Sequence, residues 1–179
     1  MVIIFLADGF ELVEALTPLD MLKRAGADVK TVSINDTLEV TSSCSVTVKA
    51  DMTLNCLKGQ NIEMIVLPGG MPGAENLRNN EIVCSLAKNT YERGLPIGAI
   101  CAAPYILGEL GILNNKKAIC FPGFEKYLYG AVLSDTNTAT DGNIITAAGM
   151  GAALPFSYEL ISVLYGKEKA DKIMKSIMA

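Results

Sequence analysis

The sequence contains no histidine and no tryptophan among its 179 residues. The absence of histidine excludes every catalytic arrangement in which an imidazole activates a nucleophile. It also removes a common zinc ligand, and the five cysteines include no C-x-x-C pair, so we expect no metal site. A general acid or base in this protein must therefore be another type of side chain.

Long apolar runs and clusters of basic residues are also missing. The apolar start, Met1–Ala7, contains no basic residue, so it predicts a first strand rather than a signal peptide. No stretch approaches the length of a membrane span, which predicts no membrane partner. The formal net charge is −4 and Lys and Arg residues are scattered, so we expect no nucleic-acid partner.

Cysteines occur singly and in odd number. They are Cys44, Cys56, Cys84, Cys101 and Cys120. Without paired spacing or an export signal, they predict reduced thiols in a cytoplasmic protein.

Apolar segments alternate with segments of helical periodicity along the chain. The predicted strands are Val2–Ala7, Asp28–Ile34, Met64–Leu67, Pro96–Ile100, Ala118–Phe121 and Ile144–Ala147, with a hairpin or edge strands over Glu39–Ala50. The predicted helices are Leu12–Ala25, Ala74–Asn79, Glu81–Arg93, Tyr105–Leu110, Ala152–Leu164 and Lys167–Met178. This alternation predicts an α/β fold with a mostly parallel sheet covered on both faces. No linker or repeat interrupts the pattern, which predicts one domain over residues 1–179.

The start of the first helix has two interpretations. Its apolar spacing begins at Leu12, but Pro18 after Thr17 suits a first helical position with a threonine cap. The sequence leaves both open.

Cys101 ends a short apolar strand and is followed by two alanines and Pro104, which opens a helix. At such a turn the free N–H groups and the positive end of the helix dipole favour a thiolate. The pattern is that of a nucleophile elbow with sulfur in place of oxygen. The alternative is a small buried residue that fills a tight turn.

Three strand ends carry residues with useful chemistry. Ligands of open α/β sheets bind beyond the carboxyl ends of the strands, and here these ends lead into Asp8–Glu14, Pro68–Gly73 and Cys101. If the three strands are neighbours, a carboxylate, a glycine-rich turn and a cysteine share one crevice. The loop Gly149-Met150-Gly151 is interpreted as a packing element.

Glu14 gains a role only if it faces Cys101. A carboxylate beside a thiolate is repulsive, so we expect Glu14 to keep its proton and donate a hydrogen bond to the sulfur. Taken alone, it is an ordinary carboxylate at a helix start.

The Gly69-Gly70 turn has a structural and a functional interpretation. In the structural one, the glycines only allow the chain to turn. In the functional one, the N–H groups of Gly70 and Ala102 hold an oxyanion. The glycines match neither a phosphate loop nor a dinucleotide motif, so we expect no cofactor.

Three motifs in order resemble the ThiJ/PfpI superfamily, in the branch of the parkinsonism-associated protein deglycase and its bacterial homologues. They are Asp8-Gly9-Phe10-Glu11-Leu12-Val13-Glu14, Leu67-Pro68-Gly69-Gly70-Met71-Pro72-Gly73-Ala74 and Ala99-Ile100-Cys101-Ala102-Ala103-Pro104. The resemblance covers nearly the whole chain. It implies a flavodoxin-like three-layer sandwich, a homodimer, Cys101 as nucleophile with Glu14 as its protonated neighbour, and Gly70 and Ala102 as backbone donors.

The chain departs from the family pattern at two places. Many members carry a histidine where Phe121 precedes Pro122, so peptidase chemistry is not expected. An arginine that often approaches the cysteine is replaced within Ser42–Ser45, which brings Cys44 into consideration as a disulfide partner of Cys101. Cys120 is a second thiol to examine, because it lies at a predicted strand end.

Two functions follow from these residues. The first is a hydrolase of methylglyoxal, glyoxal or early glycation adducts, in which Cys101 adds to the aldehyde and Glu14 moves protons. The second is a redox-responsive protein with chaperone behaviour, in which Cys101 oxidises to sulfenate and then sulfinate.

Overall fold

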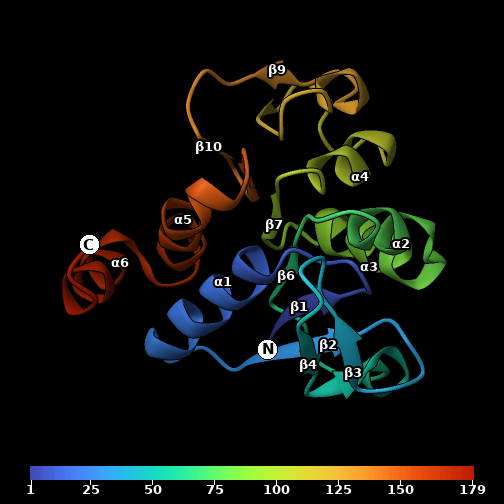
Figure 1. Cartoon of the computed structure of the whole chain (residues 1–179). Coiled ribbons are helices and arrows are strands. Elements are labelled where there is room, and N and C mark those ends of the chain that lie inside the picture. Colours follow the sequence, from blue (N-terminus) through green and yellow to red (C-terminus); the bar gives the residue numbers. More distant parts are fainter.

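The computed structural model describes all residues 1–179 and is built on a seven-stranded sheet (Figure 1). The strands of this sheet are β1 (Val2–Leu6), β2 (Val29–Ser33), β5 (Met52–Thr53), β6 (Met64–Leu67), β7 (Ile97–Ile100), β10 (Thr138–Asp141) and β11 (Ile144–Ala147). Their order is β10-β11-β7-β6-β1-β2-β5, and every neighbouring pair is parallel except β10 with β11. The expected α/β fold with a mostly parallel sheet is confirmed.

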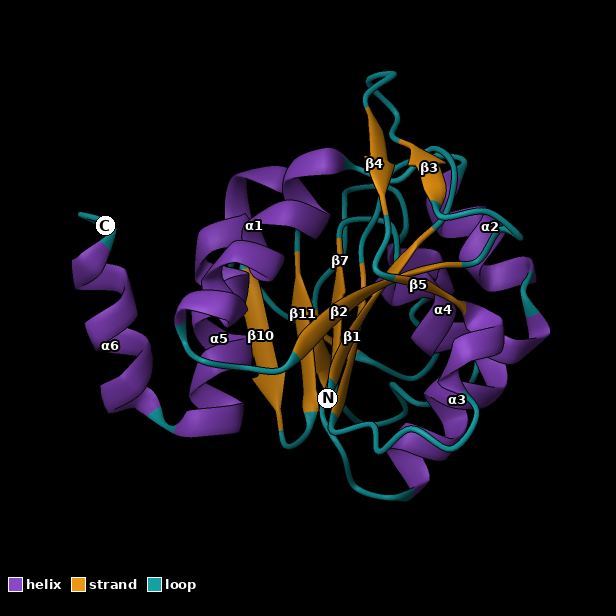
Figure 2. Ribbon diagram, turned by 90° about the horizontal axis from the view of Figure 1, so that it is seen from below, coloured by secondary structure: helices purple, strands orange, loops and turns teal.

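Helices cover both faces of the sheet. They are α1 (Leu12–Arg24), α2 (Gly73–Asn79), α3 (Glu81–Glu92), α4 (Pro104–Glu109), α5 (Ala153–Tyr165) and α6 (Lys167–Ser176). Figure 2 shows α1, α5 and α6 on one side of the sheet and α2, α3 and α4 on the other. The arrangement is the flavodoxin-like three-layer sandwich that the sequence resemblance implied.

Two hydrophobic clusters hold the layers together. Every residue of β1 is buried, as expected for a central parallel strand whose two faces are both covered by helices. Alternate β1 residues therefore enter opposite clusters: Ile3 packs with side chains of α2 to α4, and Ile4 with side chains of α1, α5 and α6. The largest fully buried side chains on the second side are Phe10 and the α5 residue Phe156.

Short elements lie at the margins of the sheet. The hairpin β3 (Glu39–Thr41) and β4 (Thr47–Lys49) confirms the expectation for Glu39–Ala50. The turn at Asp141-Gly142-Asn143 joins β10 to β11, with Gly142 at φ 62°. No helix is long and apolar enough to cross a membrane.

The predicted strand Ala118–Phe121 was wrong in extent. Only β8 (Lys117–Ala118) forms, and it pairs with β9 (Val132–Leu133) outside the main sheet. The chain leaves this ladder because the N–H of Ile119 donates to the Oγ1 of Thr146. The segment that follows is thereby held beside the end of β11.

The two interpretations of the first helix are resolved. A continuous α1 runs from Leu12, and Pro18 lies inside it and is buried. Glu14 therefore lies in the first turn of this helix, close to the end of β1.

Candidate active site

The three strands that carry the motifs are neighbours. The sheet order places β7, β6 and β1 side by side, so the loops after Ile100, Leu67 and Leu6 meet at one edge. The condition set by the sequence, that the three strands are neighbours, is therefore met.

Cys101 follows β7 directly and has a left-handed backbone, with φ 65°. This conformation is uncommon for a residue with a side chain and is typical of strained turns at functional sites. Two hydrogen bonds fix it: the N–H of Cys101 donates to Ala147 O at 2.9 Å, and the N–H of Phe121 donates to Cys101 O at 2.8 Å. The geometry is that of an elbow.

Glu14 lies against this elbow and is only 1% exposed. Its Oε2 accepts a hydrogen bond of 2.9 Å from the N–H of Gly69. Its Oε1 is buried and has no hydrogen-bond partner of normal geometry. Burial raises the pKa of Glu14 from 4.5 to about 7, while interactions with Cys101 and Gly69 oppose this rise. A carboxyl that holds its proton up to neutral pH agrees with the sequence-based expectation.

The stability of the protein should depend on pH through Glu14. The unfolded chain releases this proton near pH 4.5 and the folded chain near pH 7, so ionisation favours unfolding between these values. We expect the free energy of unfolding to fall by up to about 3 kcal/mol as pH rises from 4.5 to 8, relative to Glu14→Gln. Denaturant unfolding of both proteins at pH 5 and pH 8 measures this difference, and equal pH profiles would contradict it.

The expectation of a lowered thiol pKa was wrong. Burial, together with the charge and hydrogen bonding of Glu14, raises the pKa of Cys101 from 9 to about 12. Because Glu14 titrates first, the pair holds one proton above neutral pH. When Glu14 is protonated its negative charge is gone, and the Coulombic part of the rise in the Cys101 pKa disappears. Transfer of the thiol proton to the Glu14 carboxylate therefore gives a thiolate beside a neutral carboxyl.

Two backbone donors lie close to the sulfur. The N–H groups of Gly70 and Ala102 interact with Cys101 and oppose the rise of its pKa. Neither N–H donates to a backbone carbonyl. Both are therefore available to negative charge that develops at or beside the sulfur.

These features agree with comparisons against known proteins. The family model described as DJ-1/PfpI matches residues 1–163. The chain belongs to the DJ-1/PfpI family.

The relatives of this chain include plant and archaeal proteins. Protein DJ-1 homolog B of Arabidopsis thaliana is 35% identical over 178 residues, which cover 99% of this chain and 41% of the relative. A Pyrococcus abyssi protein named a deglycase is 29% identical, with 91% of this chain and 98% of the relative covered. The chain thus spans less than half the length of the plant relative and nearly all of the archaeal one.

A solved structure gives the same fold. Oxidized DJ-1 of Toxoplasma gondii superposes with a TM-score of 0.95 at 35% identity, and the match covers 99% of this chain and 97% of the other. The recognition of the family from the three sequence motifs is confirmed.

Gly69 shows how tightly this DJ-1/PfpI site is packed. A Cβ at Gly69 would lie 2.6 Å from the Cβ of Cys101 and 2.6 Å from the Oε2 of Glu14. We expect Gly69→Ala to destabilise the fold by about 1–3 kcal/mol and to displace both side chains. Thermal unfolding measures the loss, with Gly151→Ala as control, because nothing lies within 4 Å of a Cβ there. Equal melting temperatures of the two variants would contradict the expectation.

The loop after β11 was missed as part of the site. A Cβ at Gly149 would lie 3.9 Å from the Sγ of Cys101 and 3.9 Å from the Oε1 of Glu14, so this loop borders the reacting atoms. The signal that identified the other loops applies here too, because β11 is the parallel neighbour of β7. Phe121 also borders this loop, because its Cδ2 is 3.4 Å from the same Cβ position.

The other candidate thiols, Cys44 and Cys120, form no disulfide bond. All five cysteines are free, so the Cys44–Cys101 bond is not formed. The loop of Cys44 does approach the site region, because Ser43 donates to the carboxylate of Glu11 at 3.0 Å. Cys120 is buried, and burial raises the pKa of its thiol to about 11. No group of three cysteine or acidic side chains is arranged to hold a metal ion.

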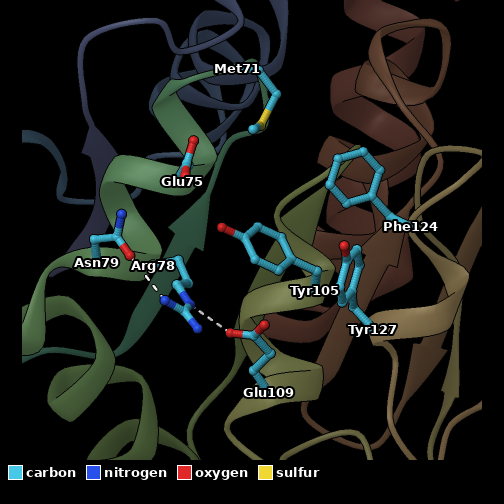
Figure 3. Close-up of a pocket in the computed structure, with 8 residues that line it drawn as sticks. All are labelled: Met71, Glu75, Arg78, Asn79, Tyr105, Glu109, Phe124 and Tyr127. Carbon is cyan, nitrogen blue, oxygen red and sulfur yellow. Dashed lines mark hydrogen bonds and ion pairs between the residues drawn. The ribbon is translucent and has the colours of Figure 1, made fainter.

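A pocket lies between α2, α4 and the segment of Phe124 and Tyr127 (Figure 3). Its volume is about 220 Å³, and it is lined by Met71, Glu75, Arg78, Asn79, Tyr105, Glu109, Phe124 and Tyr127. Figure 3 shows Tyr105 between the Arg78–Glu109 ion pair and the ring of Tyr127. Neither Cys101 nor Glu14 lines this pocket, so the reacting groups do not belong to it.

Proposed function

We propose that this chain is a cysteine-dependent hydrolase of reactive carbonyl compounds, acting on methylglyoxal, glyoxal or early glycation adducts. The observation that carries the proposal is the contact of the Cys101 thiol with a buried carboxyl whose pKa is about 7. A group that titrates near neutral pH serves equally well as acid and base. The deglycase name of the archaeal relative supports the substrate class.

The first step joins sulfur to the aldehyde. The Glu14 carboxylate takes the thiol proton while the sulfur of Cys101 forms a bond to the aldehyde carbon. The carbonyl electrons move to oxygen, where the N–H groups of Gly70 and Ala102 stabilise the negative charge. Return of the proton from Glu14 to this oxygen gives a hemithioacetal.

The second step moves a proton between two carbons. In the methylglyoxal adduct, Glu14 removes the proton from the carbon bonded to sulfur, which leaves an enediolate. Glu14 then delivers a proton to the neighbouring carbon, while the hydroxyl proton moves from the oxygen on the sulfur-bearing carbon to the neighbouring oxygen, and the product is a thioester of a 2-hydroxy acid. Water adds to this thioester, the carbon–sulfur bond breaks, the thiol regains its proton, and lactate leaves. The overall change is the addition of one water.

Product analysis tests this route. Proton NMR of a reaction with methylglyoxal in D₂O should show lactate with deuterium at the carbon that received the proton, because the Glu14 proton exchanges with solvent. The absence of lactate would overturn the proposed function. Lactate formed at the wild-type rate by Glu14→Gln would overturn the role of Glu14.

Oxidation of Cys101 is the second candidate function. The N–H groups of Gly70 and Ala102 can hold sulfinate oxygens as well as an oxyanion, and the solved Toxoplasma gondii relative is described as oxidized. Mass spectrometry after mild peroxide treatment tests it. Addition of two oxygens at Cys101 alone, with negligible aldehyde turnover, would favour this function, whereas even oxidation of all five cysteines would exclude it.

We further propose a homodimer in the cytoplasm, with a small aldehyde or glycated compound as substrate. An apolar groove of about 490 Å³ between α1 and α5 supports the dimer, because it includes the half-exposed side chains of Val13 and Leu154. The free thiols support a reducing compartment. Sedimentation equilibrium measures the oligomeric state, and a monomer at micromolar concentration would contradict the dimer.

A further inference from the structure

An uncharged cleft lies next to the site: Cys101 and Glu14 do not line it, but Gly149, which borders both, does. Its volume is about 400 Å³, and it is lined by Phe121, Pro122, Asn137, Ala148, Gly149, Met150, Gly151 and Ala152. No lining residue carries a charge, and Asn137 is the only one with a polar side chain. Phe121 is 48% exposed and Met150 is 55% exposed, so an aromatic face and a thioether are available to a ligand.

Gly149 lies between this cleft and the sulfur of Cys101. The position of a Cβ at this residue is 3.4 Å from the Cδ2 of Phe121 and 3.9 Å from the Sγ of Cys101. Because a Cβ there would be in van der Waals contact with both groups, the missing side chain of Gly149 leaves the Phe121 ring and the sulfur bordering the same space. A carbonyl carbon bonded to the sulfur would therefore direct its substituent along the Phe121 ring.

Glu14 provides a second, independent indication of a ligand here. Its Oε1 is buried and lies 3.9 Å from the same point, and apart from the interaction of the carboxyl with the Cys101 thiol it has no hydrogen-bond partner. Buried carboxyl oxygens normally have partners, because an unpaired one costs about 1–3 kcal/mol. A hydroxyl formed on the substrate beside the sulfur would provide this partner.

We infer that the cleft of Phe121 and Met150 is a binding site for the substituent of the substrate, and that the preferred substrates are α-oxoaldehydes with an aromatic or extended apolar substituent. This inference rests on the proposed function and narrows its substrate class. A methyl group fills little of the cleft, whereas a phenyl ring can stack on Phe121 and contact Met150. An anionic substituent would lose its hydration without gaining a cation.

The test compares phenylglyoxal with methylglyoxal in the full-length chain. For each variant, kcat/KM for phenylglyoxal is divided by kcat/KM for methylglyoxal. A loss of activity that affects both substrates equally leaves this ratio unchanged. We expect the wild-type ratio to exceed the Phe121→Ala ratio by about tenfold, since an apolar contact of this size contributes about that factor. Tyr129→Ala is the matched control, because Tyr129 is an exposed aromatic residue that does not line the cleft. An unchanged ratio in Phe121→Ala, with methylglyoxal still turned over, would overturn the inference and leave the proposed function intact.

Binding of an unreactive ligand tests the cleft without turnover. Acetophenone has the same phenyl ketone group but no aldehyde, and saturation-transfer NMR detects its contact with the protein. We expect transfer in the wild type, and its loss in Phe121→Ala and in Gly149→Ala, whose added methyl occupies the space between ring and sulfur. Circular dichroism verifies that both variants fold. If wild-type protein turns over no methylglyoxal, the proposed function fails, and equal transfer in all three proteins would overturn the cleft assignment on its own.

Discussion

Replacing Cys101 by alanine is expected to lower kcat/KM for methylglyoxal by about 10³-fold or more. The reason is that every covalent step of the proposed route uses this sulfur, and no other thiol lies at the elbow. Lactate formation followed by proton NMR measures the effect. Cys101→Ser should be nearly as inactive, because a hydroxyl is a much weaker acid than a thiol and Glu14 cannot deprotonate it at neutral pH.

Cys120→Ala is the control for this prediction. Cys120 is a buried thiol close in sequence to Phe121, so its variant reports the general cost of a small change near the site. We expect its kcat/KM to stay within about threefold of the wild type. Retention of wild-type turnover in Cys101→Ala would contradict the nucleophile assignment.

Replacing Glu14 by glutamine should separate the reactivity of the thiol from turnover. The amide oxygen can still accept the hydrogen bond from Gly69, but the negative charge is gone. Because that charge and its hydrogen bond raise the pKa of Cys101, we expect the pKa to fall in the variant. Alkylation by iodoacetamide at pH 8 should become about tenfold faster, while turnover of methylglyoxal should fall about 10²-fold, since no group is left to move the proton.

The pH profile of alkylation distinguishes two descriptions of the pair. A profile for Glu14→Gln that is shifted to lower pH than that of the wild type supports a carboxylate that accepts the thiol proton. A shift to higher pH would mean that a protonated Glu14 stabilises the thiolate, as expected from the sequence alone. Wild-type turnover in the variant would contradict both.

The sequence was sufficient to place the main strands and the residues of the elbow. β6 has the predicted bounds because a short apolar run between polar segments has no other way to be buried. Cys101 and Glu14 were brought together by sheet order, which follows from the rule that ligand loops gather at the carboxyl ends of neighbouring parallel strands.

Two properties required the three-dimensional structure. The raised pKa of Cys101 depends on how deeply the thiol is buried and on its contact with Glu14, and neither can be read from a helix-start motif. Similarly, the cleft at Phe121 forms where the chain leaves the β8 ladder at Ile119, whose N–H donates to the Oγ1 of Thr146. Such a single long-range contact has no periodic signature in the sequence.

The hydrogen bond between Glu14 and Gly69 joins residues 55 positions apart, and Cys101 is fixed by Ala147 from near the other end of the chain. Contacts of this sequence separation form late, because the intervening loops must close first. During synthesis, Cys101 is therefore an ordinary thiol on a flexible chain, without its acid–base partner or its backbone donors. The site acquires its chemistry only when the last strand of the sheet, β11, has docked, so a nascent or partly folded chain is expected to carry no carbonyl-directed activity.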